Sequence, residues 1–148
     1  MFKDWVVLII KPDFLWTRGT KFCPCNAATA RGAYVGDGYD AFSSLFAETV
    51  PRLPFTRPGT HLACAPTSIQ AEVLVPDPIS LDEITAIAVE SDAQAEREIC
   101  RATLQGLSID QQILVVPDFY DRQRLSRLIQ SGNRTNETIY NNGGRHDQ

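Results

Sequence analysis

Ile69-Gln70-Ala71-Glu72-Val73-Leu74-Val75, a run closed by Pro76, is the stretch on which the expected fold and site depend. Its side chains alternate with a period of two, which predicts a strand with Gln70 and Glu72 on the same face. A carboxylate between apolar neighbours on a short strand either finds a partner or becomes neutral. Glu72 is therefore a candidate functional residue, and an edge strand with this carboxylate in water is the alternative.

The composition indicates a single ordinary domain. The chain has 148 residues, of which 43% are hydrophobic and 22% are charged, so one core is expected. The longest apolar run after the first lysine, Trp5–Ile10, is far shorter than the ~20 residues of a membrane span. We therefore expect a cytosolic protein, and its four cysteines are expected to be free thiols.

Charge is distributed unevenly along the chain. Residues 18–70 carry five basic and three acidic side chains, whereas residues 71–121 carry eleven acidic side chains against Arg97 and Arg101. Because phosphate binding depends on local positive potential, a nucleic-acid contact is expected in the first of these segments. A surface that is merely soluble is the alternative.

Hydrophobic patterns predict short strands and helices. The strands are expected at Trp5–Ile10, buried on both faces, and at Lys21–Cys23, Ile84–Val89 and Ile113–Val116. The helices are expected at Asp40–Phe46 with Asp40 as its cap, from Ser91 with Gln94 in a capping box until Gly106, and at Arg122–Ile129. A long Pro-rich connection, Pro51–Pro66, is expected to be functional or disordered, and a frayed tail is expected from Ser131 onward.

Three thiols and an imidazole offer a rival interpretation. Cys23-Pro24-Cys25 and His61-Leu62-Ala63-Cys64 contain enough ligands for a tetrahedral zinc ion, although their spacing is unusual. The other interpretation of His61 is a loop histidine without a catalytic role.

Several motifs resemble one family. A Gln/Glu-x-Glu pair after a long polar loop resembles the C-terminal motif of ADP-ribosyltransferases. More closely, Gln70–Val75 followed by Pro78–Leu81 resembles the C-terminal half of the DarT family of DNA-thymidine ADP-ribosyltransferase toxins. The resemblance covers most of residues 5–120 and extends to Trp5–Ile10, Phe22 with Asn26–Ala28, Val115–Pro117 and Phe119–Tyr120.

This resemblance implies an α+β fold, with an ADP-ribosyltransferase-like mixed sheet and short helices. Residues 1–121 are expected to form the C-terminal half of the family domain, and residues 122–148 a short helix and a flexible tail. The family's N-terminal half, with a histidine and an arginine that bind NAD, is expected to be missing. We therefore expect a fragment, a truncated homologue or a chain completed by another, with self-association through exposed strand edges.

The resemblance also implies the chemistry. Glu72 is expected to be catalytic in the transfer of ADP-ribose from NAD to thymine in single-stranded DNA, and Gln70 to orient the substrate. Arg31 and Arg57 are the candidates for DNA phosphate contacts, since both are basic and precede Glu72.

Three aromatic residues are candidates for stacking on a base, although packing explains them equally well: Trp16, Tyr34 and Tyr39. The expected partners are single-stranded DNA and a macrodomain antitoxin. An inactive DNA-binding remnant is the alternative function.

Overall fold

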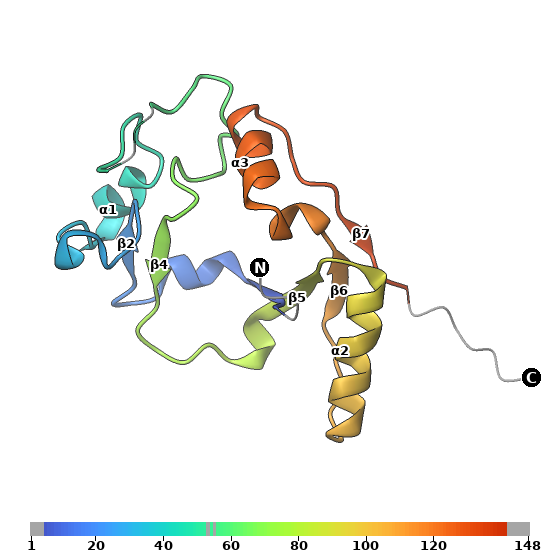
Figure 1. Ribbon diagram of the computed structural model, residues 1–148. Coiled ribbons are helices and arrows are strands. Elements are labelled where there is room, and N and C mark those ends of the chain that lie inside the picture. The colour runs from blue at the N-terminus through green and yellow to red at the C-terminus, as the bar shows by residue number, and fades with distance from the viewer. Residues whose placement is uncertain (1–4, 53, 55, 142–148) are drawn as a thin grey trace, which may run out of the picture. The chain divides into compact units, whose positions relative to one another are not determined.

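The protein has an α+β fold with two sheets and short helices (Figure 1). The computed structural model describes residues 5–52, 54 and 56–141. The strands are β1 (Val7–Ile10), β2 (Lys21–Cys23), β3 (Gly36–Asp37), β4 (Glu72–Leu74), β5 (Ile84–Val89), β6 (Gln112–Val115) and β7 (Thr138–Ile139). The α-helices are α1 (Gly38–Ser44), α2 (Asp92–Leu104) and α3 (Arg122–Gln130). None of the described helices is long and apolar enough to cross a membrane.

The chain divides into two compact units. The four-stranded unit consists of Met1–Lys11, Ser80–Arg122 and Thr135–Gln148, and the three-stranded unit of Pro12–Ile79 and Gln123–Arg134. Each unit therefore combines segments that are far apart in the sequence.

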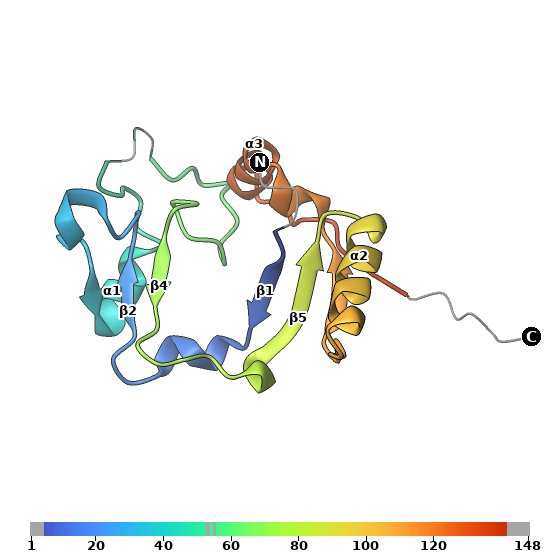
Figure 2. The same ribbon diagram turned by 60° about the horizontal axis from the view of Figure 1, so that its bottom comes forward.

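The four-stranded unit contains a mixed sheet in the order β1-β5-β6-β7. Strand β5 is antiparallel to β1 and parallel to β6, and β7 is antiparallel to β6. Figure 2 shows β1 beside β5, with α2 next to β5. Helix α2 connects β5 to β6 and buries its apolar side against them, in a core of Val89, Ala95, Ile113 and Val115. The mixed sheet expected from the sequence is confirmed.

Helix α2 begins as its sequence predicts. The Ser91 hydroxyl accepts a hydrogen bond from Gln94 N–H at 3.3 Å. The Gln94 side chain accepts from Glu90 N–H at 2.8 Å and donates to the Trp5 carbonyl at 2.7 Å. Gln94 therefore caps the helix and also fixes the chain that leads into β1.

The three-stranded unit contains an antiparallel sheet in the order β3-β2-β4. Helix α1 packs against β2, and the Phe42 ring lies 5.5 Å from Phe22 and 5.4 Å from Phe46. Leu45 is buried. The predicted apolar stripe of α1 is therefore a packing surface.

Three local predictions were wrong. Strand β1 lies at the sheet edge with Val7 38% and Leu8 47% exposed, because only β5 pairs with it among the described strands. Asp37, not Asp40, precedes α1, and its side chain makes no capping bond. The tail expected to be frayed contains β7, because Thr138 pairs with Val115 of β6.

Candidate active site

Glu72 stands at the start of β4, in the three-stranded unit. The turn before it is closed by a hydrogen bond from Ala71 N–H to the Ser68 carbonyl at 3.1 Å. Opposite Glu72 in β2 lies Cys23, and paired residues project to the same face of a sheet. On this face, Glu72 Oε2 accepts a hydrogen bond from Ala27 N–H at 3.2 Å.

The carboxylate of Glu72 is half-buried, and only one of its oxygens is held. Oε1 has no hydrogen-bond partner among the residues that the structure describes. One oxygen thus fixes the direction of the side chain, and the other remains able to accept a bond from a ligand.

The donor to Glu72 lies in a tightly turned segment. Asn26 Oδ1 accepts from Ala28 N–H at 2.9 Å, which fixes the backbone around Ala27. Ala30 and Arg31 follow in the left-handed region, with φ of 49° and 59°. This conformation costs roughly 1–2 kcal/mol per residue, and such strain gathers at functional sites. The turn leaves the Arg31 side chain exposed.

Arg57 binds the loop that precedes Glu72. Its Nη1 donates to the Ala65 carbonyl at 2.9 Å and to Thr67 Oγ1 at 3.0 Å. Its Nη2 donates to the carbonyls of Leu62 at 3.0 Å and Ala63 at 3.3 Å. A planar guanidinium suits this fan of acceptors. Arg57 therefore holds the loop together, a role that the sequence did not predict.

Thr67 extends this hydrogen-bond network along the loop that leads to Glu72. Its hydroxyl donates to the Ala47 carbonyl at 2.7 Å, and its N–H donates to the Leu45 carbonyl at 2.8 Å. Thr67 and Ser68 are each only 2% exposed. Thr67 thus ties the loop to the end of α1, five residues before β4 begins at Glu72.

Gln70 does not lie on the strand. It is exposed in the turn before β4, where its N–H donates to Ser68 Oγ at 3.1 Å. The predicted strand at residues 69–75 is reduced to Glu72–Leu74, because Ser68 closes a turn instead of extending the ladder. The prediction that Gln70 and Glu72 share a strand face is therefore wrong.

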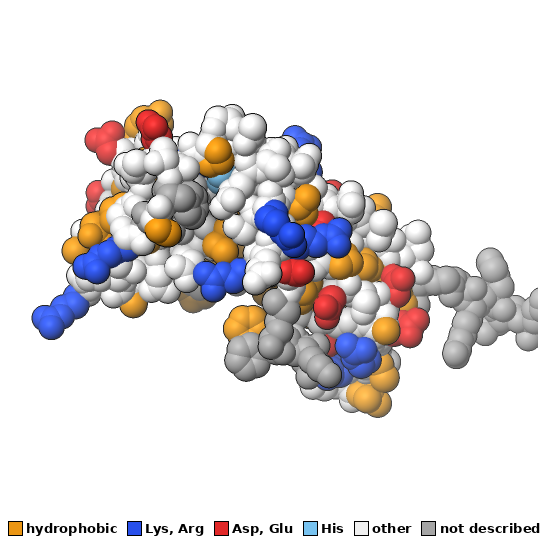
Figure 3. Space-filling view, turned by 45° about the horizontal axis from the view of Figure 1, so that its top comes forward, with side chains coloured by type: hydrophobic (Ala, Val, Ile, Leu, Met, Phe, Trp, Pro, Cys, Tyr) orange, Lys and Arg blue, Asp and Glu red, His pale blue; other side chains and the backbone are white. Residues whose placement is uncertain are grey.

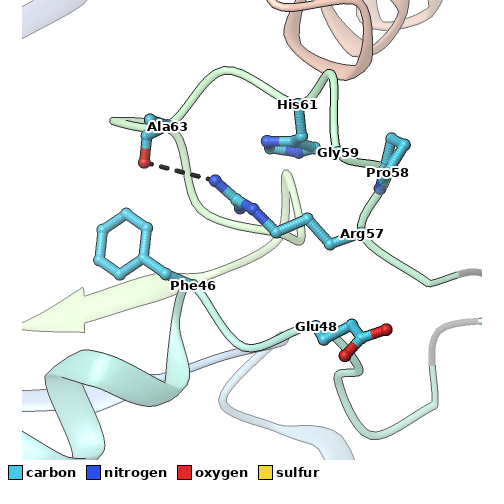
Figure 4. Close-up of a pocket in the computed structure, with 7 residues that line it drawn as sticks. All are labelled: Phe46, Glu48, Arg57, Pro58, Gly59, His61 and Ala63. Atoms are coloured by element: carbon cyan, nitrogen blue, oxygen red, sulfur yellow. Dashed lines mark hydrogen bonds between the residues drawn. The ribbon is translucent and has the colours of Figure 1, made fainter.

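A cavity of about 390 Å³ opens in the same loop (Figure 4). Figure 4 shows the Phe46 ring and the His61 imidazole on either side of the Arg57 side chain, while the Glu48 carboxylate points away. His61 is 7% exposed, and its Nδ1 lies 3.1 Å from the Leu62 carbonyl. The residues that line the cavity are Phe46, Glu48, Arg57, Pro58, Gly59, His61 and Ala63. Aromatic and guanidinium planes of this kind suit a flat ring.

The cavity was not predicted as a site. Its sequence signals were the turn residues Pro58 and Gly59 beside a histidine, but the fold alone brings Phe46 to them. The aromatic candidates lie outside its lining. Trp16 is 61% exposed and packs on Phe42 with ring centres 5.0 Å apart, and Tyr39 is 73% exposed. Tyr34 packs against the core around Cys23.

The zinc interpretation requires four residues that do not come together. Cys23 Sγ and Cys25 Sγ lie 4.0 Å apart and are buried, whereas Cys64 is exposed. No group of three or more His, Cys, Asp or Glu side chains among the described residues is placed to hold a metal. Burial, followed by the neighbouring Cys23, raises the pKa of Cys25 above its ordinary value, and the charge of Glu72 adds to this.

The α+β fold with a mixed sheet and short helices is consistent with the fold class of ADP-ribosyltransferase-like proteins. The chain belongs to the DarT family, whose model, described as ssDNA thymidine ADP-ribosyltransferase, DarT, matches residues 1–121. No curated protein matches the chain.

Proposed function

We propose that this protein transfers ADP-ribose from NAD to thymine in single-stranded DNA, with Glu72 as the catalytic carboxylate. The observation that carries the proposal is the state of this side chain: Oε2 is held by Ala27 N–H, while Oε1 has no partner among the described residues. The family is an ADP-ribosyltransferase family that acts on single-stranded DNA.

An acceptor oxygen with these properties fits the nicotinamide ribose of NAD. Bound NAD supplies a ribose whose bond to nicotinamide breaks, so that nicotinamide leaves with the electron pair and positive charge develops on the sugar. Glu72 accepts a hydrogen bond from a ribose hydroxyl through Oε1 and stabilises that charge. A nitrogen of the thymine ring forms the new bond to the sugar carbon, and its proton passes to the Glu72 carboxylate and then to solvent.

The fixed direction of the carboxylate is important for the rate. A group already aimed at developing charge needs no reorganisation during the reaction, and removing one such group costs about 3 kcal/mol in a well-studied protease. Ala27 N–H holds the carboxylate itself, and the bond from Arg57 to Thr67 orders the loop that leads to the strand. We propose that Gln70, exposed in the turn before Glu72, orients the incoming base or ribose.

The loop and its cavity are the proposed place for the DNA. The flat groups of Phe46, Arg57 and His61 suit stacking with an unpaired base, an interaction worth roughly 1–3 kcal/mol. Arg31 is the proposed phosphate contact, since it is exposed and its side chain bonds to no other residue that the structure describes. Arg57 contributes to the same site by holding the loop.

The test is a mass measurement on a thymidine-containing single-stranded oligonucleotide incubated with protein and NAD. The wild type is expected to add one ADP-ribosyl group, and Glu72→Gln to lose at least about 100-fold in rate, following the magnitude for a lost electrostatic group. Glu96→Gln is the matched control, since Glu96 is exposed on α2 in the other unit. Transfer that continues at the wild-type rate in Glu72→Gln would exclude the mechanism.

An inactive DNA-binding protein is the second candidate for the same surface. Binding of the oligonucleotide without release of nicotinamide would support that function and remove the enzymatic one. We propose the cytoplasm as the site of action and a macrodomain antitoxin as the partner that controls the activity. Self-association through the exposed β1 edge is also proposed.

A further inference from the structure

Helix α3 and the turn after it form a strongly basic segment. Residues 122–134 contain no Asp or Glu, and their arginines are Arg122, Arg124, Arg127 and Arg134, all exposed. The apolar residues of the helix, Leu125, Leu128 and Ile129, are half-buried. This segment lies beyond the residues matched by the family model.

Two arginines of this segment, Arg127 and Arg134, are not paired with acidic side chains in the described part of the chain. Arg101 on α2 pairs with Glu98 of its own helix at 2.8 Å. By contrast, Arg127 Nε donates to the Gln123 carbonyl at 3.3 Å, and neither Arg127 nor Arg134 forms an ion pair within the described part of the chain. Figure 3 shows a group of Lys and Arg side chains in the middle of the view, with Asp and Glu side chains beside it. Positive charge that is not neutralised attracts phosphate.

The same helix is bonded directly to the cavity loop within the three-stranded unit. The last carbonyls of α3 accept hydrogen bonds from Leu62 N–H to Ile129 and from the Thr60 hydroxyl to Gln130, both at 2.8 Å. These two loop residues flank His61, which lines the cavity. The basic segment and the cavity therefore belong to one continuous piece of structure.

We propose that the exposed basic face of residues 123–134 binds the phosphate backbone of the single-stranded DNA whose base enters the loop cavity. This inference rests on the proposed function and extends it to a segment outside the family match. Counterion release gives a slope of about −0.7 per phosphate contact in single strands. Lowering the salt from 1 M to 0.1 M then increases the DNA affinity by roughly 5-fold for each arginine that contacts a phosphate.

The test measures binding of a fluorescent thymidine-containing oligonucleotide to the full chain by anisotropy, over a series of salt concentrations and without NAD. Arg127→Gln/Arg134→Gln is the test variant. Arg97→Gln/Arg101→Gln on α2 is the control, because it makes the same change in net charge. Circular dichroism and thermal melting establish that both variants are folded. The test variant is expected to bind about 25-fold more weakly at 0.1 M salt, with a slope smaller by about 1.4, and the control is expected to match the wild type.

Several results would overturn the inference: no binding of single strands by the wild type, equal losses in the two variants, or tighter binding to a duplex of the same sequence. The transfer assay separates this inference from the proposed function. If the test variant transfers ADP-ribose with an unchanged KM for the oligonucleotide, the basic surface does not bind the DNA, and the proposed enzymatic function stands. If binding depends on Arg127 and Arg134 but the wild type transfers no ADP-ribose, the proposed enzymatic function is refuted, and DNA binding by the basic surface stands.

Discussion

Gly132, two residues after the end of α3, is expected to control the order of the cavity loop. Its φ is +75°, and an added Cβ would lie 2.5 Å from the Thr60 carbonyl oxygen. Asn133 N–H and Gly132 N–H bond to carbonyls of the last helical turn, as in a Schellman ending. Gly132→Ala therefore strains the backbone and also pushes the loop away from the helix.

Gly106 provides a matched control at the end of α2. It also has a positive φ, +71°, in the same type of helix ending, but an added Cβ would meet nothing within 4 Å. Both alanine variants lose roughly 1–2 kcal/mol from the left-handed conformation. Gly132→Ala additionally weakens the bonds from Leu62 to Ile129 and from Thr60 to Gln130, and at about 1 kcal/mol each the extra loss is about 2 kcal/mol.

Hydrogen exchange measured by mass spectrometry separates the two effects. In Gly132→Ala, peptides covering residues 57–67 are expected to exchange about 30-fold faster, which corresponds to the extra 2 kcal/mol. In Gly106→Ala these peptides are expected to keep wild-type exchange, while those at the end of α2 become less protected. Unchanged protection of residues 57–67 in Gly132→Ala, or the same change in both variants, would refute the docking of the loop on α3.

Two further predictions concern other parts of the site. Arg57→Lys is expected to lower the free energy of unfolding in urea by about 2 kcal/mol and to slow transfer, because an ammonium cannot reach the same acceptors. Arg52→Lys, at an exposed position, serves as its control. Cys25 is expected to resist iodoacetamide at pH 8 while Cys64 reacts, since the raised pKa of Cys25 keeps its thiol protonated. The stability that this neutral thiol contributes is fully present below pH 9.0, the ordinary pKa of the thiol in an unfolded chain. It is lost as the pH rises through the higher pKa of the folded state. Peptide mass spectrometry reads the labelling, and early modification of Cys25 would contradict the burial argument.

Periodicity predicted the elements whose packing is local. The capping box of α2 and the apolar side of α3 need only the sequence near them, and both are present. The pairing of strands depends on segments that are distant in the sequence, and it was therefore harder to predict from the sequence. Strand β7 forms because β6 offers Thr138 a ladder partner, and a polar sequence of Asn, Gly and Thr gives little sign of this.

The site was predicted in part for the same reason. The alternation around Glu72 pointed to a carboxylate on a strand, which is where the structure has it. The oxygen partner of this carboxylate is a backbone N–H, at Ala27, and no side-chain pattern identifies such a donor. The role of Arg57 depends on four carbonyl and hydroxyl acceptors that converge only when the loop is folded.

The order of the loop before Glu72 bears on the proposed transfer reaction. A long connection is expensive to order, at roughly 1–2 kcal/mol of backbone entropy per residue, yet Arg57 and Thr67 fix this one with bonds of 2.7–3.0 Å. This entropy cost is explained if the loop presents a preformed surface to a flexible single strand, because a rigid site loses no further entropy on binding. The structural order around Glu72 thus favours a binding and transfer site over a passive link between strands.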